Sequence, residues 1–80
     1  MKIPVIKQLV ETYSLVELRA AEDALLDEQP PAIAVSGDDE GERLTHILAA
    51  VWIHGYLVAH DGAFPEALRE YSKKVRTSIS

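Results

Sequence analysis

A run of carboxylates followed by a histidine is the part of the sequence whose residue types and spacing best suit chemistry. Asp38, Asp39, Glu40 and Glu42 fall within five residues, and His46 follows one helical turn later. In a helix, Asp39, Glu42 and His46 share one face, and carboxylate and imidazole ligands at this spacing can bind zinc or another divalent ion. One helix does not close a coordination sphere, so such a site needs ligands from another helix or a partner chain.

The same acids also fit the start of a helix. Unpaired amides at a helix N-terminus favour carboxylates by about 0.3–1 kcal/mol each, and Ser36 or Asp38 is suited to be the cap. In this interpretation, which we favour, no cofactor is bound and His46 belongs to a solvated polar stripe opposite the apolar face. The acids also argue against a phosphate site, since they compete for the amides and repel the anion. A metal at Asp39, Glu42 and His46 remains the alternative.

The histidines do not belong to a recognisable catalytic constellation. His46, His54 and His60 have no cysteine nucleophile to act with, and no serine lies in a Gly-x-Ser-x-Gly elbow. His60, near the expected end of a helix, is explained by the helix dipole. We therefore expect no catalytic residues, and a non-enzyme is favoured over an enzyme without the question being closed.

Length and composition favour a single small helical domain over residues 1–80. The apolar content is 48%, which is ordinary for a globular protein, but so short a chain has a marginal core and contains no cysteine to cross-link it. Self-association is the expected supplement, and the lack of cysteine fits the cytoplasm. The net charge of −5 argues against nucleic-acid binding. The longest apolar run, 47–53, is too short to span a membrane, and no secretion signal is visible.

Hydrophobic spacing predicts an all-α fold, a compact bundle of four helices. Pro4 suits a first helical turn, Ser14 and Glu17 form a capping box, and Gly62 is the expected left-handed cap of the third helix. A short extended segment, about 32–36, precedes the long central helix. We favour a connector there, with strand pairing to a second copy as the alternative. The expected helices cover 4–13, Leu15 to the Gln29–Pro31 stop, about 38–60, and Phe64 onward.

The central helix has a wide apolar face, typical of a largely buried helix. Gly55 in its middle costs about 1 kcal/mol relative to alanine, which is explained if another backbone approaches closely. We expect a homo-oligomer, most simply a dimer, whose interface contains Trp52, Gly55, Tyr56 and Ala59. The predicted apolar face consists of Leu44, Ile47, Leu48, Val51, Trp52, Gly55 and Val58.

The segments MKIPVIKQLVETYSLVEL, GDDEGE and LTHILAA together resemble a group of short, uncharacterised bacterial proteins, a domain of unknown function. The resemblance implies a stand-alone cytoplasmic protein with no assigned activity and no residue roles. The leading hypothesis is a non-enzymatic homo-oligomeric module that acts through protein–protein contacts, with another protein as a further possible partner. The chain has basic ends around an acidic middle, a pattern that either orients self-association or reflects helix-end electrostatics alone.

Overall fold

Four helices and the segments that join them make up the computed structural model, which describes residues 2–79 and the side chains as far as Arg76. The helices are α1 (Ile3–Thr12), α2 (Leu15–Leu26), α3 (Glu40–His60) and α4 (Phe64–Ile79). Residues 2–79 contain no strand. The predicted all-α, four-helix fold is therefore confirmed.

The helix starts follow local sequence signals. Ser14 Oγ accepts a hydrogen bond from the Glu17 N–H at 3.2 Å, and Glu17 Oε1 accepts one from the Ser14 N–H at 3.0 Å, so the capping box is confirmed. The predicted cap of α3 at Ser36 or Asp38 is wrong. The cap is Asp39, whose Oδ1 accepts from the Glu42 N–H at 2.7 Å, because α3 begins only at Glu40.

The end of α3 also differs from the prediction by one residue. Asp61, not Gly62, takes the left-handed conformation, with φ 51° and ψ 39°. Asp is one of the few residues besides glycine that tolerates this region. Gly62 has no positive φ, and a Cβ there would lie 3.0 Å from Oε2 of Glu66, the end of a flexible side chain.

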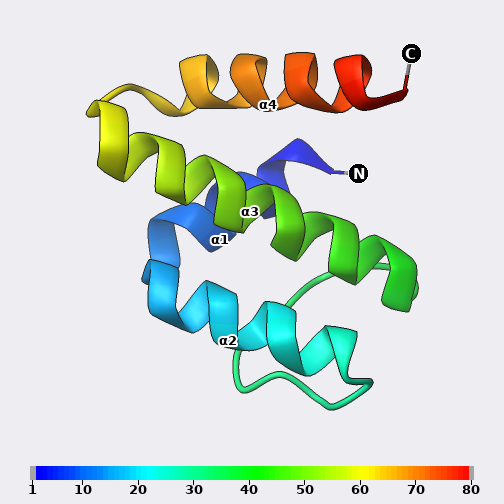
Figure 1. Cartoon of the computed structure of the whole chain (residues 1–80). Coiled ribbons are helices and arrows are strands. Elements are labelled where there is room, and N and C mark those ends of the chain that lie inside the picture. Colours follow the sequence, from blue (N-terminus) through cyan, green and yellow to red (C-terminus); the bar gives the residue numbers. More distant parts are fainter. Residues whose placement is uncertain (1, 80) are drawn as a thin grey trace.

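Helix α3 is the centre of the fold. In Figure 1 it crosses the middle of the molecule, with α2 and α4 on opposite sides and α1 behind it. The extensive helix–helix contacts of the described chain all involve α3. The buried apolar core consists of Ile6, Leu9, Leu18, Ala21, Ile47, Ala49, Ala50, Ile53 and Ala67.

The segment between α2 and α3 is an extended connector, as favoured from the sequence. Ile33 and Val35 alternate with exposed residues and pack against the core. Gly37 lies tightly on the first turn of α3, where a Cβ would come within 2.6 Å of Arg43 Cγ and 2.9 Å of the Arg43 backbone nitrogen. Pairing of this segment with a second chain stays a prediction.

The buried side of α3 is only partly the side predicted. Ile47 is buried, but Leu48 is 39% exposed and Val58 is 69% exposed. The reason is that α3 is apolar on two adjoining faces, so residue type alone does not show which face its neighbours cover. The fully covered positions of α3 are His46, Ile47, Ala49, Ala50 and Ile53.

Candidate functional site

His46 is fully buried, with both ring nitrogens hydrogen-bonded. The backbone N–H of Lys2 donates to Nε2 at 2.9 Å, and Nδ1 lies 2.7 Å from the carbonyl oxygen of Ser36. Since the amide can only donate and the carbonyl can only accept, the ring is the neutral tautomer with its proton on Nδ1. The expectation that His46 belongs to a solvated stripe is wrong, and nothing in the local sequence signals its burial.

The three candidate metal ligands have separate structural partners. Asp39 caps α3, and Glu42 Oε1 accepts a hydrogen bond from the Asp38 N–H at 2.8 Å. The lone pair of His46 Nε2 is occupied by the Lys2 amide, so a metal ion there would have to displace it. Within residues 2–79, no group of three or more histidines, cysteines or acids has the geometry to hold a metal ion.

The acidic turn instead forms ion pairs with Lys2, near the start of the chain. The Lys2 ammonium lies 3.6 Å from Asp38 Oδ1 and 4.0 Å from Glu42 Oε1. Lys2 and Asp38 are exposed and Glu42 is half-buried, so these ion pairs are individually weak, worth about 0–1 kcal/mol, but they act beside the partly buried hydrogen bond to His46. The sequence showed that the first residues of the chain are basic, but it did not show that Lys2 pairs with Asp38 and Glu42.

The other two histidines lie apart from this cluster. His54 is half-buried, and its buried Nδ1 has no hydrogen-bond partner among the described residues. His60 is exposed in the last turn of α3 and packs on the ring of Tyr56, with ring centroids 4.3 Å apart. The fold therefore does not gather the three histidines into one site.

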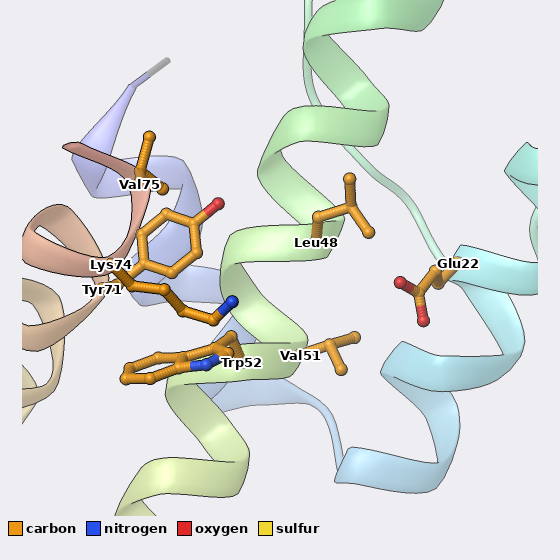
Figure 2. Close-up of a pocket in the computed structure, with 7 residues that line it drawn as sticks. All are labelled: Glu22, Leu48, Val51, Trp52, Tyr71, Lys74 and Val75. Atoms are coloured by element: carbon orange, nitrogen blue, oxygen red, sulfur yellow. The ribbon is translucent and has the colours of Figure 1, made fainter. Parts of the chain in front are cut away.

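A largely apolar surface lies along α3 between α2 and α4, and its residues Val51, Trp52 and Tyr56 also pack against the core. It consists of two grooves of about 400 and 370 Å³ that share Val51 and Trp52. We call the α3 residues that line one or both grooves, namely Leu48, Val51, Trp52, Gly55 and Tyr56, the open face. Figure 2 shows the first groove, in which Glu22 of α2 and Lys74 of α4 extend toward α3 from opposite sides.

Three of the four predicted interface residues, Trp52, Gly55 and Tyr56, line the open face. Ala59, the fourth, is exposed one turn beyond Gly55. Trp52 stacks on Tyr56 at a centroid distance of 5.5 Å and contacts Tyr71 of α4 at 5.7 Å, so the aromatic part of the surface is held in place.

Gly55 has no neighbour that accounts for it. A Cβ placed on Gly55 would meet nothing within 4 Å. The close backbone approach expected at this residue is therefore absent within the described chain. The open space at Gly55 is part of the floor of the second groove.

Two tyrosines, Tyr56 and Tyr71, have pKa values raised above the usual value for a tyrosine side chain. Burial raises the pKa of Tyr71. For Tyr56, desolvation raises the pKa first, and the hydrogen bond from its hydroxyl to Glu66 Oε1 at 3.1 Å and the negative charges of Glu66 and Glu70 raise it further. At neutral pH both side chains are uncharged, which suits an apolar contact with polar edges.

The sequence model of DUF6952, described as a family of unknown function, matches residues 1–80. The chain belongs to the DUF6952 family. No curated protein and no solved structure matches the chain. The expected resemblance to a family of unknown function is thus confirmed, and DUF6952 membership assigns no role to any residue.

The open face of this DUF6952 protein presents aliphatic and aromatic side chains, with charged residues at its edges. Among residues 2–79, no helix is both long and apolar enough to cross a bilayer.

Proposed function

We propose that this DUF6952 protein is a non-enzymatic, homodimeric helical module that acts through protein–protein contacts, with the open face of α3 as the dimer interface. The observation that carries the proposal is Gly55. A glycine in the middle of a 21-residue helix is unfavourable by about 1 kcal/mol, and no contact within the described chain compensates for it. Close approach of a second molecule supplies that compensation.

The modest core supports the same proposal. Four of the buried apolar residues are alanines, whereas Leu48 on the open face is 39% exposed. Covering apolar area contributes about 25 cal/mol per Å², so burying the open face adds stability that the core lacks. The absence of cysteine fits a cytoplasmic location for the module.

The direct test is the mass of the protein in solution. We expect multi-angle light scattering after size-exclusion chromatography to give twice the chain mass of 8.8 kDa at micromolar concentration. A protein that stays monomeric over this range contradicts the proposal.

A matched pair of variants connects the dimer to the open face. Gly55→Leu adds a side chain to the floor of the groove and is expected to give a monomer that keeps its helical circular dichroism, because nothing in the described chain lies within 4 Å of a Cβ at this position. Ala20→Leu introduces the same side chain at an exposed position of α2 outside both grooves and is expected to remain dimeric. If both variants are dimeric, the interface lies elsewhere.

A further inference from the structure

On the open face, an exposed leucine and a glycine lie at matching distances from the centre. Leu48 stands 39% exposed, and Gly55, seven residues and about two turns along α3, leaves open space. The midpoint between them lies between Val51 and Trp52, the two residues that both grooves share. If a second copy is related to the first by a half-turn about a two-fold axis that runs across α3 at this midpoint, Leu48 of each copy lies over Gly55 of the other.

The charges of α2 are arranged about the same centre. Glu22 borders the groove that contains Leu48, whereas Arg19 borders the groove that contains Gly55. The two residues are one turn apart and have opposite signs. The same half-turn therefore brings Glu22 of one copy toward Arg19 of the other.

Helix α4 repeats the pattern on the opposite side. Lys74 borders the Leu48 groove, and Glu66 is hydrogen-bonded to Tyr56 at the Gly55 end. Between them, Tyr71 contacts Trp52 at the centre of the face. The half-turn brings Lys74 of one copy toward Glu66 of the other.

We propose, on the basis of the dimer put forward above, that the second copy docks antiparallel, with the two-fold axis running across α3 between Val51 and Trp52. Leu48 of each copy fills the space at Gly55 of the other. Glu22 faces Arg19 and Lys74 faces Glu66 across the interface. A two-fold interface must be self-complementary. The pairing of Leu48 with Gly55 and the two pairs of opposite charges satisfy this requirement.

Shape decides between this arrangement and a parallel one. In a parallel dimer, the two-fold axis runs along α3. Unlike charges are opposed there too, because Glu22 of one copy faces Lys74 of the other. However, the parallel dimer puts Leu48 on Leu48 and leaves Gly55 opposite Gly55, which crowds one end of the contact and leaves the other end unfilled. The antiparallel arrangement also opposes the two helix dipoles favourably.

Disulfide trapping distinguishes the two orientations, and the natural chain has no cysteine to interfere. Leu48→Cys and Gly55→Cys chains, one carrying a mass label, are mixed, oxidised and weighed by mass spectrometry. We expect the mixed 48–55 disulfide to dominate. Leu48→Cys alone is expected to cross-link poorly, since its two copies lie about 10 Å apart along the helix direction, beyond the ~7 Å limit for a disulfide.

A charge exchange within α2 gives an independent result. Glu22→Arg is expected to weaken the dimer roughly tenfold, as it opposes Arg19 of the second copy at two equivalent places. The double variant Arg19→Glu/Glu22→Arg restores wild-type affinity only in the antiparallel arrangement. In a parallel dimer it stays weak, because the exchanged charges face like charges on α4.

The control for net charge is Glu11→Lys on α1, behind α3, which is expected to leave the dimer unweakened in sedimentation equilibrium. Readily formed 48–48 and 55–55 disulfides with a weak double variant overturn the antiparallel docking while leaving the homodimer intact. A dimeric wild type that gives no 48–55 disulfide also overturns the docking. A monomeric wild type overturns the proposed function itself.

Discussion

The backbone N–H of Lys2 donates a hydrogen bond of 2.9 Å to Nε2 of His46, 44 residues further along the chain. The other ring nitrogen of His46 is bonded to the Ser36 carbonyl oxygen. One buried imidazole thus joins the start of the chain, the connector and the central helix. These bonds account for a histidine at a fully buried position.

The two hydrogen bonds of His46 can be removed separately. His46→Gln can keep an acceptor near the Lys2 amide but loses the donor to Ser36, and His46→Asn does the reverse. Each leaves a buried group without its partner, so we expect a loss of about 1–3 kcal/mol in the free energy of unfolding, measured with urea at fixed protein concentration. Lys7→Gln, at an exposed position of α1, is the control, with an expected change within about 0.5 kcal/mol. Unchanged stability in both His46 variants would disprove the role of the imidazole.

Two glycine-to-alanine changes are expected to have opposite signs. Gly37→Ala pushes a methyl group against the Arg43 backbone and should destabilise the chain by about 1–3 kcal/mol. Gly55→Ala meets nothing and should stabilise the protomer by up to about 1 kcal/mol. Urea unfolding at concentrations low enough to give monomers measures both. A destabilised Gly55→Ala monomer would show that the space at Gly55 is filled.

The carboxylate of Asp39 is expected to matter as a helix cap rather than as a charge. Asp39→Ala removes the acceptor for the Glu42 N–H and should lower stability by about 1 kcal/mol, whereas Asp39→Asn keeps an acceptor and should lower it much less. For a chain of this size, the alanine variant should melt roughly 4–8 °C lower. Thermal unfolding followed by circular dichroism measures both variants, and equal losses would point to charge instead.

High pH should weaken the fold partly through Tyr71. Burial raises its pKa above the usual 10.0, so below that pH the phenol is protonated in both the folded and the unfolded states and its contribution is fully present. Above it, the unfolded chain releases the proton first, and the free energy of unfolding falls as pH rises toward the folded pKa. Tyr71→Phe should make this alkaline fall shallower in urea titrations at several pH values. An identical slope in the variant would contradict the burial of the hydroxyl.

Zinc is expected to leave the melting temperature unchanged. Asp39, Glu42 and His46 each accept a hydrogen bond from the backbone, so a metal ion would have to replace these bonds. The measurement is thermal unfolding with and without added zinc on protein purified without an affinity tag. A zinc-dependent rise that the Asp39→Asn/Glu42→Gln variant lacks would establish the metal site.

Local signals explain why the helices could be predicted from the sequence. The Ser14–Glu17 capping box acts within one turn, and Pro4 fits the start of α1 whatever the rest of the chain does. The cap at Asp39 was predicted one or three residues too early, and the left-handed cap at Asp61 one residue too late, because several neighbouring residues are competent caps and packing decides between them.

Relationships between distant segments could not be predicted. His46 has the same residue type and spacing whether it is exposed or buried, and its burial depends on Lys2 and Ser36. The sequence predicted that Trp52, Gly55 and Tyr56 of the open face would be left for an interface, but it placed Leu48, which is 39% exposed, on the buried face. Coverage depends on where α1, α2 and α4 pack, which the periodicity of α3 alone does not contain.

The central position of α3 has a consequence for synthesis on the ribosome. Helices α1 and α2 are only 10 and 12 residues long, below the length at which an isolated helix is stable in water. Their extensive contacts are with α3, so the first half of the nascent polypeptide has little to fold against until α3 leaves the exit tunnel. Acquisition of structure should therefore be late and abrupt during translation.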